Sequence, residues 1–156
     1  MIDIDCRSAV PALDQLLKEL REAMGLPRPP AASPHTNIVV DGVEVVLAAE
    51  PYADTGELQV CVDLGEIPEP KARHAYRAML ESNLLVGGLN VGVMTLHPDA
   101  QRGSLVLRLP LTPELRGDAL ADAVRHSVEL SKSWRSFIER LPATRSPRLH
   151  HAAGHH

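Results

Sequence analysis

The second half of the chain carries the pattern that most constrains the fold. Its apolar residues change between helical and strand-like spacing, with segments at residues 68–85, 90–97, 104–111 and 114–141. The two middle segments read as short strands, and in the second of them four leucines at every other position face one way. The outer two segments have apolar residues at helical spacing. Gly87 and Gly88 follow the first helical segment, and Pro142 follows the second. We therefore predict a helix, two strands and a long final helix.

The first half adds a helix and three strands, expected at residues 8–24, 37–40, 43–48 and 58–64. The helix carries leucines at helical spacing. Asp41 and Gly42 form a pair that favours a tight hairpin turn between the first two strands. The complete order, α-β-β-β-α-β-β-α, predicts an α+β fold in which a twisted antiparallel sheet packs against helices.

The length of 156 residues predicts one domain, which we place at residues 1–142. Residues 143–156 are rich in Arg, Pro and His, and we expect a disordered tail there. Residues 28–34 contain three prolines and predict an extended linker after the first helix.

The charge and the apolar runs exclude several kinds of partner. The formal net charge is −4, which argues against nucleic acid, because Lys and Arg must neutralise its phosphates. No apolar run reaches the roughly 18 residues of a membrane-spanning helix. The N-terminus lacks the basic and apolar pattern of a signal peptide. Cys6 and Cys61 are too few for a disulfide framework. We therefore expect a cytoplasmic protein with no membrane partner.

No pattern of catalytic or metal-binding residues stands out, and we predict no enzyme, no cofactor and no metal site. Residues 87–92 are glycine-rich but follow a helix, so a helix cap is favoured over a phosphate-binding loop. Cys61 lies within a strand, which favours a structural thiol over a nucleophile. Tail histidines could bind a transition metal, at His150, His151, His155 and His156. Without a rigid frame, a fortuitous affinity is the preferred interpretation.

The second half also carries a resemblance to a known family. Its order of helix, strand, strand and helix, with MLESNLL at residues 79–85 and Trp134 late in the final helix, resembles the class I chaperones of type III secretion systems, the Tir-chaperone family. The resemblance covers about residues 13–141. It implies a small cytosolic homodimer that holds a secreted effector in a non-globular form. The implied partners are the effector, a second copy of the chain and, for release, the secretion ATPase.

Two apolar surfaces are candidates for these contacts. For the effector groove we select residues of the first helix and the later strands: Leu13, Leu17, Leu20, Val91, Val93 and Val106. The resemblance implies that the helix at residues 68–85 packs against its copy, through a stripe of Ala72, Tyr76, Met79, Leu80 and Asn83. Packing within the chain's own core remains an equal alternative for this stripe, and it is expected for at least half of the leucines of the first helix.

The favoured function is a secretion chaperone without catalysis, which binds the N-terminal segment of an effector. The alternative is a dimeric α+β scaffold or adaptor that binds a folded protein. A small enzyme is the least favoured class, because no nucleophile–base pair or metal-ligand spacing is visible.

Overall fold

The computed structural model describes residues 9–28, 35–49, 56–86, 92–98 and 101–145. Helices and strands follow one another as α1 (Ala9–Met24), β1 (His35–Val40), β2 (Val43–Ala49), β3 (Glu57–Glu66), α2 (Glu69–Val86), β4 (Val93–Leu96), β5 (Arg102–Pro110) and α3 (Gly117–Arg140). This is the predicted order, and the α+β fold class is confirmed. Within these residues, none of the helices has an apolar stretch of the length that crossing a membrane requires.

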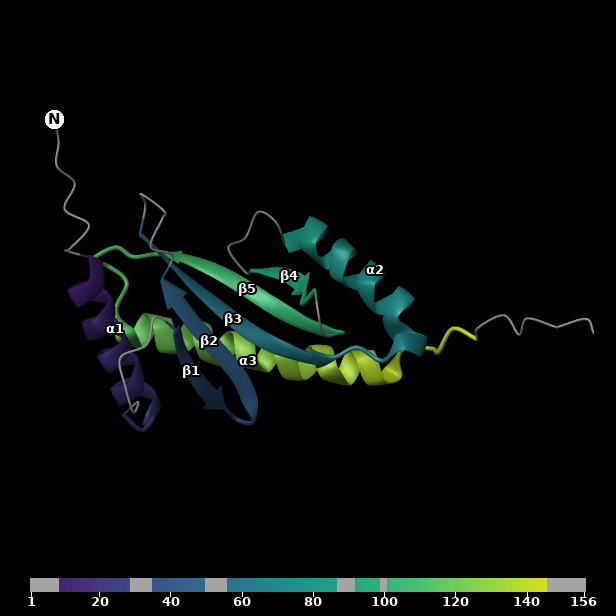
Figure 1. Ribbon diagram of the computed structural model, residues 1–156, viewed down its shortest axis with the longest axis horizontal. Helices are drawn as coiled ribbons and strands as arrows, with labels where there is room; N and C mark the ends of the chain where they lie inside the picture. The colour runs from purple at the N-terminus through teal and green to yellow at the C-terminus, as the bar shows by residue number, and fades with distance from the viewer. Residues whose placement is uncertain (1–8, 29–34, 50–55, 87–91, 99–100, 146–156) are drawn as a thin grey trace, which may run out of the picture.

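The strands form one antiparallel sheet in the order β1-β2-β3-β5-β4 (Figure 1). β3 lies at the centre, and β1 and β4 lie at the two edges. The β1–β2 hairpin turns at Asp41 and Gly42, whose φ angles of 50° and 78° are both positive. A tight hairpin turn of the primed type needs positive φ at both positions, so the turn predicted from this residue pair is present.

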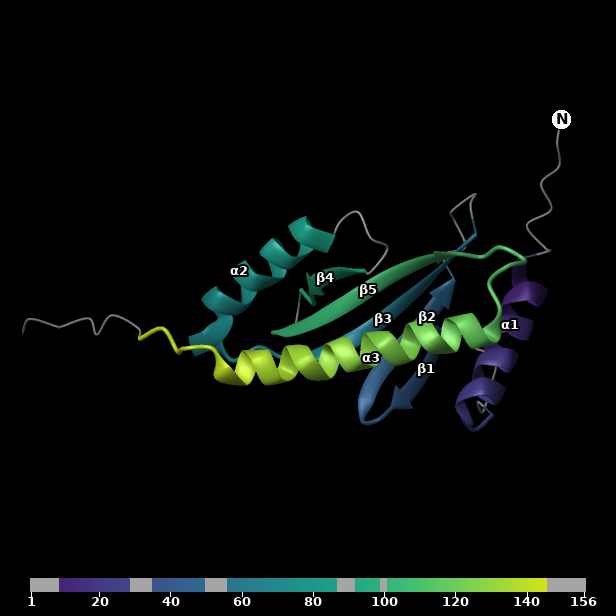
Figure 2. The same ribbon diagram turned by 180° about the vertical axis from the view of Figure 1, so that it is seen from behind.

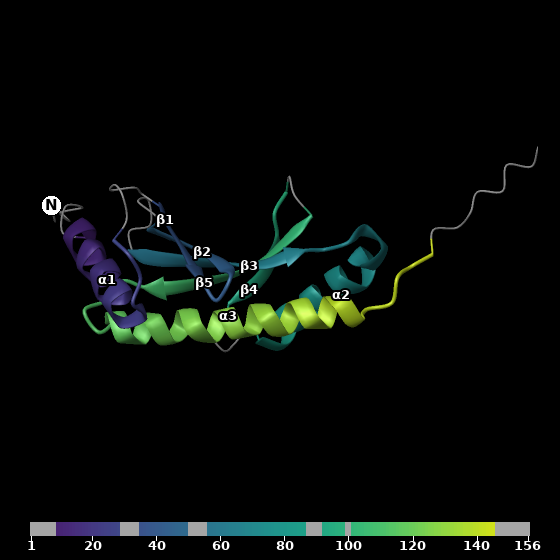
Figure 3. The same cartoon turned by 90° about the horizontal axis from the view of Figure 1, so that it is seen from below.

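The helices cover one face of the sheet. Along β2, β3 and β5, fully buried residues alternate with more accessible ones, as expected for a sheet with one covered face. α3 lies along this covered face, behind the sheet in Figure 1 and in front of it in Figure 2. Figure 3 shows α1 near one end of α3 and α2 near the other. The core between these layers is mostly aliphatic, and Trp134 is its large aromatic residue.

A close contact fixes α1 to the start of α3. A Cβ atom on Gly117 would overlap with the Cβ and the carbonyl carbon of Glu19, so only glycine fits there. The Glu19 carboxylate accepts a hydrogen bond from the Gly117 amide at 3.0 Å. Further along, Arg125 donates to the carbonyl oxygen of Ala23 at 3.0 Å. The bond from Gly117 is the main reason that the pKa of Glu19 is lowered.

The chain after α3 stays in contact with the domain at least as far as Thr144. The amide and the hydroxyl of Thr144 both donate to the carbonyl oxygen of Pro70, at 2.7 and 2.8 Å. Lys71 donates to the carbonyl oxygen of Ile138 at the end of α3, at 3.1 Å. The tail predicted to begin at Ala143 therefore has its first residues held against α2, and residues 146–156 lie outside the described chain.

Candidate interaction surfaces

The uncovered face of the sheet carries a row of small apolar side chains that crosses four strands. The register pairs Val93 with Val106, Val106 with Cys61, and Cys61 with Val46. Directly paired residues project from the same face, so these four lie side by side. Val93 is 50 % exposed and the other three are half-buried. We call these four residues the valine row. Polar pairs flank it on both sides: Gln59 with Arg108, and Ser104 with Thr95.

Cys61 lies in the valine row on the central strand. Burial raises the pKa of its thiol, which disfavours the thiolate. A protonated, half-buried thiol behaves as a small apolar side chain. Cys61 therefore contributes to the apolar surface, and its raised pKa is the opposite of the lowered pKa that activates a nucleophilic cysteine.

The five described residues of the predicted groove lie on different faces of the sheet. Leu20 is 1 % exposed and belongs to the core, while Leu13 and Leu17 are half-buried against that core. α1 packs on α3, which covers the opposite face of the sheet from Val93 and Val106. Val91 lies outside the described residues. Periodicity marked the apolar side of each element correctly, but it could not show that these sides belong to different faces.

In the part of the sheet that the structure describes, β1 has a strand partner on one side only, so its other backbone edge is open. In a two-residue hairpin the closing pair, Val40 and Val43, exchanges hydrogen bonds, and every second pair after it does the same. The backbone groups of Asn37 and Val39 therefore point away from β2. Asn37 pairs with Val46, so this edge continues directly from the valine row.

The predicted dimer stripe on α2 divides between the core and the surface. Met79 is 3 % exposed and packs in the core, with Ala72 and Tyr76 half-buried against it. Asn83 bonds to the backbone of β4. Leu80, by contrast, is exposed.

The apolar surface of α2 is larger than predicted. Leu80, Leu84 and Leu85 are 70 % to 84 % exposed, and Leu96 on the neighbouring β4 is 41 % exposed. The dimer stripe predicted from the sequence does not include Leu84 and Leu85. Their signal was present in the run from residue 84 to residue 86, which is apolar at every position and so cannot be buried on one side alone. We call Leu80, Leu84 and Leu85 the exposed leucines of α2.

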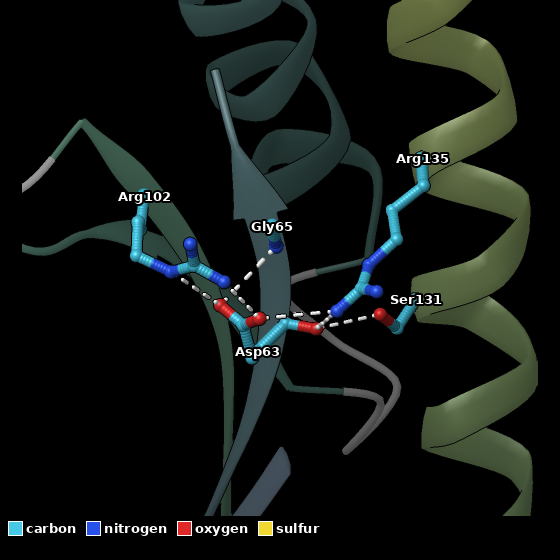
Figure 4. A network of polar contacts seen from close by, with 5 residues as sticks. All are labelled: Asp63, Gly65, Arg102, Ser131 and Arg135. Atoms are coloured by element: carbon cyan, nitrogen blue, oxygen red, sulfur yellow. Dashed lines mark hydrogen bonds and ion pairs between the residues drawn. The ribbon is translucent and has the colours of Figure 1, made fainter. Parts of the chain in front are cut away.

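A polar cluster surrounds Asp63, where the register between β3 and β5 shifts (Figure 4). Its carboxylate accepts hydrogen bonds from Arg102 at 2.6 Å, from Arg135 at 3.0 Å and from the Gly65 amide at 3.2 Å. Its carbonyl oxygen accepts one from the Ser131 hydroxyl at 2.6 Å. Hydrogen bonding to Asp63 raises the pKa of Arg102. These paired charges join β3, β5 and α3, so the cluster acts as a structural clasp.

A cleft of about 380 Å³ lies next to this clasp, and Lys71, Arg102 and Arg135 are among its lining residues. Both arginines already bond to Asp63, and Lys71 bonds to the end of α3. These three charged side chains therefore stabilise the contacts between β3, β5, α2 and α3. Across the described part of the chain, no three or more His, Cys, Asp or Glu side chains are grouped to hold a metal ion. The tail histidines lie outside that part.

Several solved structures share this fold at low sequence identity. The structure of the ExsC–ExsE complex superposes with a TM-score of 0.66 and 15 % identity, covering 90 % of this chain and 98 % of that chain. The HopA1–SchA chaperone–effector complex gives 0.64 and 17 %, over 87 % and 99 % of the two chains. The ExoT–SpcS complex from Pseudomonas aeruginosa gives 0.58 and 17 %, over 79 % and 97 %.

Comparison with curated proteins finds no match. The sequence model of the Tir chaperone protein (CesT) family, however, matches residues 15–135, from α1 to the last third of α3. The matched segment includes all of the sheet and the valine row. This chain therefore belongs to the Tir chaperone protein (CesT) family.

Proposed function

We propose that this chain is a cytoplasmic secretion chaperone that binds the N-terminal segment of a secreted effector and keeps it extended and non-globular. Membership of the chaperone family supports this class of function. A similar structure is itself described as a chaperone–effector complex. Because the identity is only 17 %, that likeness concerns the fold, and the binding surface is argued from the residues of this chain.

The observation that carries the proposal is the open β1 edge beside the valine row. An extended segment that adds along β1 can bond to the outward backbone groups of Asn37 and Val39. Strands lie about 4.8 Å apart, so Val106 on β5 is about 19 Å from a strand added to β1. The bound segment must therefore continue from β1 across the uncovered face of the sheet to cover the valine row. The chain thus offers backbone bonding and an apolar surface to one extended partner.

Backbone bonding alone would hold such a segment weakly. Each hydrogen bond contributes about 0.5–1.5 kcal/mol net, and ordering a flexible segment costs a comparable amount per residue. Apolar side chains on the valine row must supply the surplus. We therefore place the specificity for the effector in the spacing of its apolar residues, and we assign the chain no catalytic step. Release falls to the export machinery, with its ATPase as the proposed partner.

We further propose a homodimer formed through the exposed leucines of α2. Each of these side chains would lose unfavourable contact with water when covered by the same helix of a second copy. Two copies would present two β1 edges to one effector, which raises the overall affinity through effective concentration.

Co-expression of this chain with candidate effectors, chosen from the genes next to its own, tests the proposal. The expected product is a stable complex in which limited proteolysis spares an N-terminal segment of the effector. Hydrogen exchange should show slower exchange at the amides of Asn37 and Val39 in the complex than in the free chain. A partner that binds as an intact folded domain, with unchanged exchange along β1, would instead support an adaptor and contradict the chaperone proposal.

A further inference from the structure

β4 is the second edge strand of the sheet, and its register shows which of its backbone groups point outward. β4 pairs only with β5 in the described sheet. The amide of His97 donates to the carbonyl oxygen of Arg102 at 2.9 Å, which makes this a hydrogen-bonded pair. Hydrogen-bonded pairs alternate along an antiparallel ladder, so Thr95 bonds toward β5. The backbone groups of Met94 and Leu96 therefore point away from the sheet.

The side chain of Asn83 occupies the outward groups of Met94. Its amide nitrogen donates to the carbonyl oxygen of Met94 at 2.9 Å, and its amide oxygen accepts from the Met94 amide at 2.8 Å. A primary amide carries a donor and an acceptor close together, as a peptide group does. Asn83 thus makes the pair of bonds that a residue of a neighbouring strand would make.

This arrangement makes the two edges of the sheet unequal. The outward groups of β1 at Asn37 and Val39 face away from the sheet, whereas those of β4 at Met94 are taken by α2. If both edges were open, β1 of one copy could add to β4 of the next. Such a head-to-tail contact adds further copies until a ring closes, or without limit where the rotation between copies allows no ring. The exposed apolar side chains of Val93 and Leu96 on β4 would favour it further.

We propose that Asn83 is an edge guard, which prevents β4 from accepting β1 of a second copy. With Met94 occupied, Leu96 is the one residue of β4 whose outward backbone groups are left for an added strand, too few to form a ladder. The guard therefore restricts strand addition to the β1 edge and leaves self-association to side-chain contacts. It is carried by α2, so it is in place whenever α2 is packed on β4.

The direct test replaces Asn83 with Ala in the full chain. We expect the Met94 amide to exchange at least tenfold faster, because its acceptor is lost. We also expect a mass by light scattering that exceeds the wild-type mass and rises with protein concentration. Asn83→Leu, which fills a similar volume without the amide, should behave in the same way and serves if the Ala variant folds poorly.

Two controls separate edge exposure from a general loss of stability. Glu81→Gly weakens α2 at an exposed position and leaves the amide of Asn83 in place, so its mass should equal that of the wild type. Met94→Pro in the Asn83→Ala background removes the outward N–H, which an edge strand tolerates, and should restore the wild-type mass. The proposal is wrong if Asn83→Ala and Asn83→Leu keep the wild-type mass, if Glu81→Gly assembles equally, or if Met94→Pro does not reverse the assembly.

Discussion

Two neighbouring residues on the open face of the sheet have similar positions but different side-chain polarity. Val106 and Ser104 are two positions apart on β5, project from the same face and are both half-buried. One belongs to the valine row and the other to the polar row beside it. A substitution at each therefore separates the effect of apolar contact from the effect of position.

We expect Val106→Asp to weaken effector binding at least tenfold, or about 1.4 kcal/mol, because the bound segment would cover an unpaired carboxylate. Ser104→Asn should reduce binding much less, since its row is already polar, and the neutral amide avoids a second carboxylate opposite Asp63. Titration calorimetry with the N-terminal effector segment measures both affinities, and circular dichroism checks both folds. The assignment of the valine row to the binding surface is wrong if the Val106→Asp variant is unfolded. It is also wrong if the two variants lose the same amount of affinity for the effector segment.

Asp63 shows how one carboxylate can fix three elements. We expect Asp63→Ala to lower the free energy of unfolding by about 1–3 kcal/mol, because two arginines lose a largely buried partner. Asp122→Ala removes an exposed ion pair with Arg125 and should cost no more than about 0.5 kcal/mol. Urea unfolding measures both values. Similar small losses in the two variants would show that the clasp contributes little.

Among the elements, α1 and α3 are joined by a group that titrates. The folded-state pKa of Glu19 is lowered by the hydrogen bond from Gly117, so the folded chain favours the charged carboxylate. Its stabilising contribution is present above the unfolded-state pKa and is lost as the pH falls through the folded-state pKa.

Glu19→Gln should therefore flatten the loss of stability on acidification. The difference between wild type and variant is expected to shrink between about pH 5 and about pH 3, because carboxyl groups of the unfolded chain titrate near pH 4. Urea unfolding across this range provides the measurement. Identical pH dependence in the two proteins would show that Glu19 does not couple the helices.

α2 presents one side to the core and another to solvent. We expect Leu84→Glu to weaken the dimer, since it would place an unpaired charge in the contact. Ser133→Glu, an exposed position on α3, should leave the dimer unchanged, and Met79→Glu should unfold the chain, because Met79 lies in the core. Light scattering across micromolar concentrations gives the masses. A wild-type monomer throughout that range would end the dimer proposal.

For the molecule as a whole, the last contact of the described chain after α3 is made by Thr144. Deleting residues 146–156 should leave the melting temperature within a few degrees, the scale of about 1 kcal/mol or less. Ending the chain after Leu141 also removes the two bonds from Thr144 to Pro70 and should lower it further. Scanning calorimetry on both truncations distinguishes them. An equal effect from the shorter deletion would place a stabilising contact beyond residue 145.

The order of elements was predictable because its signals are local. Asp41 and Gly42 specify their turn within four residues, and apolar periodicity marks the buried side of each helix. The separation of Leu20 from Val106 was not predictable, since it depends on which face of the sheet α1 joins. The same holds for Asn83, which lies on the inner side of α2 but meets β4 only through tertiary packing. Periodicity indicates which side chains are buried, but only the tertiary structure shows which element packs against them.

The open face of the sheet has a mechanical consequence for the proposed client. The described helices pack on the other face, so a segment beside β1 would be held from one side only. Tension applied at one end of the segment would separate it from β1 one residue pair at a time. Each step would need only a small part of the total binding free energy. The same surface could therefore bind a client for long periods and release it when the export machinery pulls on one end. This release requires no conformational change of the chaperone.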